Sequence, residues 1–119
     1  MIFRLAEQYL IRAEALAQQG NLNGSQADLN TIRNRAGLAN TSATDQPSLL
    51  AAISHERQVE FFTEWGHRWL DLKRSKTIDS VMNVATPLKG NSWKTSQQLY
   101  PIPQPEIVND NKLIQNPGY

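Results

Sequence analysis

The chain has 119 residues, of which 39% are hydrophobic and 19% are charged, and its net charge is +1. This composition is typical of a globular domain, and a chain of this length can bury about two thirds of its unfolded surface. The near-neutral charge includes no basic block, which argues against a nucleic-acid or anionic-membrane partner. The absence of cysteine excludes disulfides, zinc fingers and a thiol nucleophile. We therefore expect residues 1–119 to form a single domain.

A helix is predicted from about Ile2 to Gln19, because apolar residues recur there at three- and four-residue spacings and Gly20 stops the pattern. Its apolar arc spans about 160°, whereas about 100° is enough for one packing partner. We therefore expect the helix to contact two neighbours. No capping residue precedes it, which indicates a segment of a longer protein. In such a segment, exposed apolar residues of this helix would favour self-association: Phe3, Leu10 and Ile11.

A second helix is predicted to follow and to end near Arg35, with Gly37 as its stop. Asn23 or Ser25 is the expected cap, since both side chains accept hydrogen bonds from free backbone N–H groups. Three residues are expected to face the core: Leu29, Ile32 and Ala36. Together the two helices would form an antiparallel hairpin.

A third helix is predicted to begin after Asp45, its expected cap, with Pro47 in the first turn, and to run through Trp65 until Gly66 interrupts it. Residues 67–75 continue as a shorter helical piece, and residues 75–98 show little regular pattern. The last twenty residues carry four of the six prolines, which favours an extended, turned tail. No stretch alternates as a strand would, so the predicted class is all-α with an irregular, proline-rich C-terminal tail.

Charges and aromatic residues are mixed along the third helix and the piece that follows. Glu56, Glu60 and Glu64 are spaced at i, i+4 and would repel one another unless cations lie close. Towards the N-terminus the same arc continues into Leu49 and Ile53, so it is not a solvated face. We expect a partly buried structural network in which arginines, including Arg33 or Arg35, bind the carboxylates. Its predicted members are Glu56, Arg57, Glu60, Glu64, Arg68 and Asp71.

Catalytic and metal-binding alternatives have little support in the sequence. A glycosidase needs two carboxylates roughly 5–10 Å apart, but any helix with glutamates at i, i+4 offers that spacing. His55 and Glu56 do not start a zinc-protease motif, because position 59 is Val59. Residues 109–111 are more typical of a turn than of a calcium loop. We expect no enzyme activity, no metal and no cofactor.

Trp93 is the one candidate ligand-binding residue. An indole in an irregular loop beside Lys94 can stack on a sugar ring. The more common role of a tryptophan is to anchor a loop on the core. Both interpretations remain open at the level of sequence.

Four segments in this order resemble the C-terminal portion of the SusD/RagB family: RLAEQYLIRAEALAQQGN, ADLNTIRNRAGL, ISHERQVEFFTEWGHRWLDLKRS and the tail from YPIPQPEI to LIQNPGY. The third segment and the tail are the specific ones, because the first hairpin resembles any tetratricopeptide-type helix pair. Related chains often read E-G-x-R-W-F-D after the third helix, whereas this chain has an extra residue, Trp65, before Gly66.

The resemblance implies an α-helical fold in which tetratricopeptide-like helix pairs support a more irregular ligand-binding part. This agrees with the hairpin predicted from the residues, which also predict a long third helix. It also implies a non-enzymatic, lipid-anchored protein on the cell-surface face of the outer membrane, within polysaccharide-utilisation systems. Such a protein captures a glycan or oligosaccharide and passes it to a SusC-like TonB-dependent transporter. Family members are much longer, and their glycan contacts lie mostly outside the matching portion, so the resemblance assigns no binding residue here.

Two other classes of protein remain as alternatives. The hairpin is also compatible with a helical-repeat module that binds a peptide, although one hairpin is fewer than the roughly three repeats that such arrays need. A carbohydrate-active enzyme would instead require a carboxylate pair in an open cleft.

Overall fold

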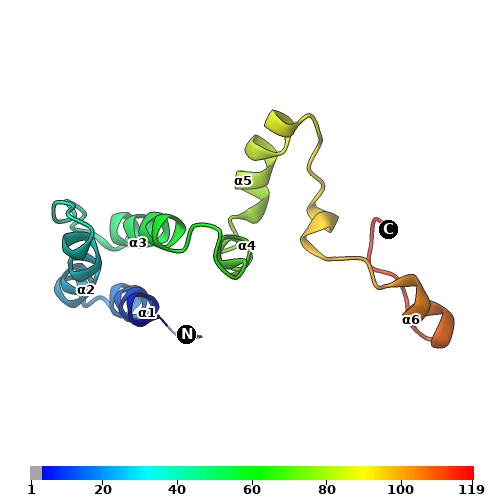
Figure 1. Ribbon diagram of the computed structural model, residues 1–119, viewed down its shortest axis with the longest axis horizontal. Helices are drawn as coiled ribbons and strands as arrows, with labels where there is room; N and C mark the ends of the chain where they lie inside the picture. The colour runs from blue at the N-terminus through cyan, green and yellow to red at the C-terminus, as the bar shows by residue number, and fades with distance from the viewer. Residues whose placement is uncertain (1–3) are drawn as a thin grey trace. The chain divides into compact units, whose positions relative to one another are not determined.

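The computed structural model describes residues 4–119 and contains only helices and irregular segments over that range (Figure 1). The predicted all-α class is therefore confirmed. The chain divides into two compact units, the first ending at Arg68 and the second spanning Trp69–Tyr119. The elements, in chain order, are α1 Leu5–Gln18, α2 Leu22–Arg35, α3 Gln46–Glu60, α4 His67–Arg74, α5 Ile78–Ala85, the 3-10 turns η1 Pro87–Lys89 and η2 Thr95–Gln98, and α6 Gln104–Asn109.

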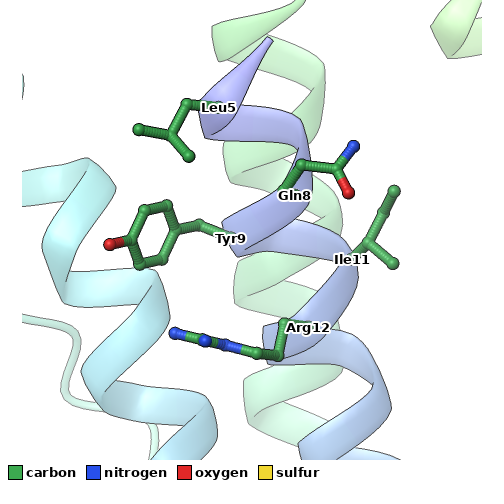
Figure 2. A pocket seen from close by; sticks show the side chains of 5 residues that line it. All are labelled: Leu5, Gln8, Tyr9, Ile11 and Arg12. Atoms are coloured by element: carbon green, nitrogen blue, oxygen red, sulfur yellow. The ribbon is translucent and has the colours of Figure 1, made fainter. Parts of the chain in front are cut away.

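Helix α1 packs against both α2 and α3, as its wide apolar arc predicts. Its outer side also carries a surface hollow of about 370 Å³, where Tyr9 and Arg12 extend towards α2 (Figure 2). Ile11 is about half exposed, but Leu10 is fully buried, so the expectation that Leu10 is available for self-association is wrong. Ile2 and Phe3, which were expected to belong to this helix, lie outside the described residues.

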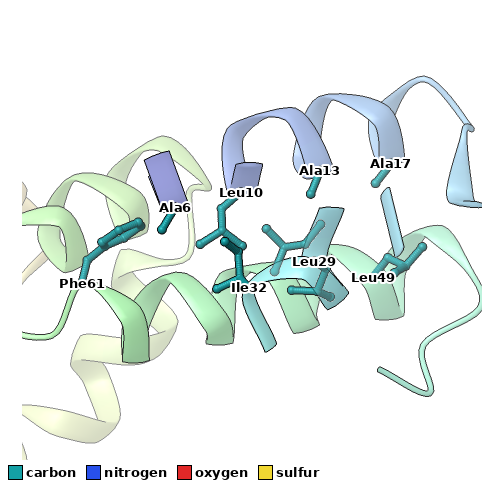
Figure 3. Close-up of a cluster of buried hydrophobic side chains, with 9 residues drawn as sticks. Ala6, Leu10, Ala13, Ala17, Leu29, Ile32, Leu49 and Phe61 are labelled. Carbon is teal, nitrogen blue, oxygen red and sulfur yellow. The ribbon is translucent and has the colours of Figure 1, made fainter. Parts of the chain in front are cut away.

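The core of the first unit lies where these three helices meet (Figure 3). Helix α1 contributes mostly alanine, and such small side chains allow a helix to approach its neighbours closely. The larger side chains come from α2, α3 and the residue that follows α3. The buried apolar cluster consists of Ala6, Leu10, Ala13, Ala17, Leu29, Ile32, Leu49, Ile53 and Phe61.

The ends of α2 differ from the prediction. Its cap is Asn21, whose side chain accepts a hydrogen bond from the Gly24 backbone N–H at 3.0 Å. Neither Asn23 nor Ser25 has this role, because the helix begins at Leu22, directly after the turn that ends α1; Ser25 is instead fully buried. Ala36 lies just beyond the last helical residue and is exposed, so it does not face the core as expected.

Helix α3 begins as predicted and ends earlier than predicted. Asp45 and Ser48 form a reciprocal capping box, and Pro47 occupies the first turn. The helix ends at Glu60 rather than continuing through Trp65. Thr63, Trp65 and Gly66 have φ angles of 62°, 43° and 72°, which are left-handed and incompatible with a right-handed helix. The chain turns here and becomes helical again at His67.

The second unit has more regular structure than the sequence pattern indicated. Helix α5 occupies part of residues 75–98, where little was expected, and buries Ile78. The tail is irregular as predicted but includes the short helix α6. The Gln115 side-chain amide accepts from the Ile102 backbone N–H at 2.8 Å and donates to its carbonyl oxygen at 3.0 Å. Among the described residues, no helix has the length and apolar character needed to cross a membrane.

Candidate functional site

The carboxylates of α3 are bound by arginines from the two neighbouring helices. Glu60 receives hydrogen bonds at 2.6 Å from Arg4, which precedes α1, and from Arg35 at the end of α2. Arg4 also binds Glu64 at 2.6 Å. Arg33 of α2 binds Glu56 at 3.0 Å. Thus Arg33 and Arg35 both contact the predicted carboxylates.

Burial differs along this row of carboxylates. The side chains of Glu56 and Glu60 are only 5% and 10% exposed, whereas that of Glu64 is 34% exposed. The hydrogen bond with Glu64 raises the pKa of Arg4 above its ordinary value, with the charge of Glu60 acting in the same direction. Glu56 and Glu60 lie one helical turn apart in α3, and because each is bound by a guanidinium, their mutual repulsion is offset. Glu64 lies beyond the end of the helix, so it does not continue this row as the sequence spacing predicted.

The other predicted members of the network occupy different surroundings. Arg57 is buried, and its guanidinium lies 5.4 Å from the centre of the Phe61 ring. Arg68 is half buried and lies beside the turn after α3. Asp71 belongs to the second unit, where it binds Arg74 within α4 at 3.2 Å.

Two arginine contacts in the first unit were not anticipated from the sequence. Arg12 of α1 binds Asp28 of α2 through Nε and Nη2, both at 2.6 Å. Arg4 was not assigned to the carboxylate network, although it supplies two of its ion pairs. The sequence did not indicate that Arg12 would bind Asp28. The two residues are sixteen positions apart, and they meet only because α1 and α2 pack against each other.

Trp93 lies in a surface hollow of about 600 Å³ in the second unit. Its indole N–H donates to the Asp79 carboxylate at 2.7 Å, and its ring makes a T-shaped contact with the Trp69 ring, with 6.1 Å between the ring centres. The hydrogen bond from Trp93 lowers the pKa of Asp79 below its ordinary value. These contacts connect the indole to α5 through Asp79 and to α4 through Trp69. The hollow beside it is otherwise lined mainly by hydroxyl, amide and ammonium groups, including Asn91, Lys94 and Tyr119.

No arrangement of three or more His, Cys, Asp or Glu side chains within residues 4–119 is suited to hold a metal ion. The described part of the first unit carries arginine side chains paired with carboxylates, and the second unit places an indole beside polar side chains.

Comparison with known proteins gives the class of this helical protein. The model of the SusD family matches residues 1–119, and the chain belongs to that family. It is 34% identical to the starch-binding protein SusD of Bacteroides thetaiotaomicron, over 99% of this chain and 21% of that protein. It is also 34% identical to SusD-like protein P2 of Formosa agariphila, over 98% of this chain and 25% of that protein.

A solved structure supports the same fold. The crystal structure of a SusD-like protein from Bacteroides fragilis matches 99% of this chain with a TM-score of 0.78 and 29% sequence identity, and the match covers 25% of that chain. The present chain therefore spans about a fifth to a quarter of the length of these relatives. The resemblance to the SusD family seen in the sequence is confirmed.

Proposed function

We propose that this chain is the non-catalytic scaffold part of a cell-surface protein that binds a glycan or oligosaccharide and delivers it to a SusC-like TonB-dependent transporter. The observation that carries the proposal is the family match along the whole chain, together with a 34% identical relative that is named as starch-binding. In this proposal, residues 1–119 form a C-terminal segment of one domain of a longer polypeptide, which is lipid-anchored at the outer membrane.

The state of the α3 carboxylates supports a structural rather than a catalytic role. A glycosidase needs one carboxyl group that is free to donate a proton and a second one facing the sugar. Here Glu56 and Glu60 are largely buried and are bound by arginines from another helix. A carboxylate in that environment stabilises the packing of helices, since removing it would leave guanidinium groups without their partner.

We assign the same bracing role to Arg57, Arg68 and Asp71. The Arg57 guanidinium packs over the ring of Phe61, which is part of the core, and Asp71 forms an ion pair with Arg74 within α4. Trp93 is the proposed saccharide contact of the second unit, because the hollow beside it combines an aromatic face with hydroxyl, amide and ammonium groups that can form hydrogen bonds. The anchoring contacts of the indole would then preorganise that face for a ligand.

The experiment that tests the proposal uses the full-length protein encoded by the gene. Affinity electrophoresis in gels containing starch, pullulan or polygalacturonate is expected to show retardation by at least one glycan, with no release of reducing sugar. Purification from membranes is expected to retain a TonB-dependent transporter. Hydrolysis of the glycan, or a full-length protein that binds none of a broad panel of glycans, would refute the proposal.

A further inference from the structure

The hollow beside Trp93 is lined by the end of the tail as well as by the loop that follows α5. Trp93 comes from the loop, Gly118 and Tyr119 come from the tail, and all three border one space of about 600 Å³. This volume lies within the range of about 300–1,000 Å³ that is usual for small-molecule sites. Two segments of the second unit therefore each supply one aromatic side chain to the same hollow.

The end of the tail is held in this position by contacts with the loop. The Tyr119 hydroxyl donates to the Leu99 backbone carbonyl oxygen at 2.8 Å. Gly118 approaches the loop so closely that a β-carbon on it would lie 2.5 Å from the Ser96 Oγ. Tyr119 is nevertheless 53% exposed, so its ring is anchored through the hydroxyl while part of its surface stays available to a ligand.

Trp93 is anchored in a comparable way. Its indole N–H donates to Asp79, its ring contacts Trp69, and the residue is partly exposed rather than buried. Because the polar groups of Trp93 and Tyr119 are both bonded within the protein, these side chains offer a ligand mainly the apolar surface of their rings. Aromatic surface that is already held in place loses little freedom when a ligand binds to it.

The polar side chains at the hollow are in the opposite state. Asn91 and Ser92 are exposed, and within residues 4–119 their side chains have no hydrogen-bond partner. The amide of Asn91 provides donors and an acceptor, and the hydroxyl of Ser92 both donates and accepts. These groups are therefore available to the hydroxyls of a ligand.

We propose that Tyr119 is the second aromatic contact of the Trp93 saccharide site, so that a pyranose unit of a glycan binds against both rings and the tail is part of the binding site. A pyranose has C–H groups that suit aromatic surface and hydroxyls that can pair with Asn91 and Ser92. The inference rests on the proposed glycan-binding function and deepens it, because it names a further binding residue and makes the site dependent on the position of the tail.

The polar lining favours a saccharide over a proline-rich peptide, which is another class of ligand that aromatic-lined sites bind. A proline residue has no N–H and offers only its carbonyl oxygen as an acceptor. Each sugar hydroxyl both donates and accepts, so it can pair with the oxygen of the Asn91 amide as well as with its N–H groups.

The test is affinity electrophoresis of this 119-residue chain in gels containing starch, pullulan or polygalacturonate, with poly-proline as the peptide probe. We expect at least one of the three glycans to retard the chain, and poly-proline not to retard it. Tyr119→Ala is expected to weaken the binding about three- to tenfold through loss of one aromatic contact. Tyr119→Phe keeps the ring and loses only the hydrogen bond to Leu99, so a smaller loss of about twofold is expected.

Tyr100→Ala is the matched control, because it removes a 71% exposed tyrosine of the same unit that lies outside the lining of the hollow, and it should leave binding unchanged. Retardation by none of the three glycans, unchanged binding by Tyr119→Ala, or an equal loss in Tyr100→Ala would overturn the inference. Equal retardation by poly-proline would overturn the saccharide assignment. The proposed function depends on glycan binding by the full-length protein, so retardation of that protein but not of this chain would refute this inference alone.

Discussion

Replacing Glu60 with alanine tests whether the carboxylates of α3 stabilise the helix packing. In the wild-type chain this carboxylate joins Arg4, which precedes α1, and Arg35, the last residue of α2, to the end of α3. The substitution removes three hydrogen bonds of 2.6 Å from these two guanidinium groups. The Glu60 carbonyl oxygen, which accepts from Arg4 at 3.2 Å, remains in the variant.

The size of the expected stability loss depends on how exposed the two arginine partners of Glu60 are. Hydrogen bonds to charged groups contribute about 1.5–3 kcal/mol each when they are buried. The Arg4 and Arg35 side chains are 35% and 54% exposed, so both can be hydrated in the variant, and Arg4 keeps Glu64 as a partner. We therefore expect a loss of about 1–2 kcal/mol in the free energy of unfolding. For a chain of this length, that loss corresponds to a fall in Tm of about 3–10 °C.

Thermal and urea denaturation followed by far-UV circular dichroism would measure this loss. Glu106→Ala, which removes an exposed carboxylate from α6, is the control and is expected to change stability by less than about 0.5 kcal/mol. A double-mutant cycle with Arg35→Ala should give a favourable coupling energy between the two residues. If Glu60→Ala melts at the same temperature as Glu106→Ala, the carboxylate does not stabilise the packing and the structural role assigned to the network is refuted.

Three further predictions concern pH, the core and the tail. The hydrogen bond from Trp93 holds the pKa of Asp79 below its ordinary 3.8. The stability that Asp79 contributes is therefore present above pH 3.8 and is lost as the pH falls towards the lower folded pKa. Asp79→Asn should flatten the decrease in Tm that is measured below about pH 4. Leu10→Ala should reduce the free energy of unfolding by about 2–5 kcal/mol in urea titrations, because the side chain is fully buried between three helices. Gly118→Ala should loosen the end of the tail, because a β-carbon there would lie 2.5 Å from the Ser96 Oγ and 2.9 Å from its β-carbon; hydrogen exchange of the last residues would accelerate.

Each of these has a matched control in the same chain. Asp110→Asn is the control for Asp79→Asn, because it removes an exposed carboxylate of the same unit that does not bind Trp93. Ile11→Ala, at a half-exposed position next to Leu10, should reduce the free energy of unfolding far less than Leu10→Ala. Gly90 also has a positive φ, but a β-carbon at this position would meet no atom within 4 Å, so Gly90→Ala separates backbone strain from the clash. Equal effects in any of these pairs would contradict the corresponding prediction.

The parts of the fold that could be predicted from the sequence are those with local causes. The Asp45 cap lies three residues from Ser48, and the left-handed glycine after α2, Gly37, closely follows the last turn; both signals act over one helical turn and can be read without a tertiary structure. The apolar arc of α1 likewise indicated two neighbours, because the width of that arc depends only on the spacing of residues along one helix.

The errors occurred where distant contacts override local pattern. Helix α3 ends at Glu60 although the helical pattern continues, and Phe61 is then buried in the core while Thr63 and Trp65 adopt left-handed conformations. Helix α5 was missed because it has eight residues and its cap makes no side-chain hydrogen bond. Helices this short depend on tertiary packing for their stability.

The residue pattern alone was enough to establish that the chain is helical, that it resembles SusD-like proteins, and that acidic and basic side chains gather around its third helix. Which arginine binds which carboxylate became known only from the packed helices: Arg4 and Arg35 bind Glu60, and Arg33 binds Glu56. The spacing of residues fixes which side chains share a face of one helix, but a partner on another helix depends on how the helices cross. That crossing is set by packing of the whole core, and the turn that follows α3 brings Arg57 and Arg68 around one hollow.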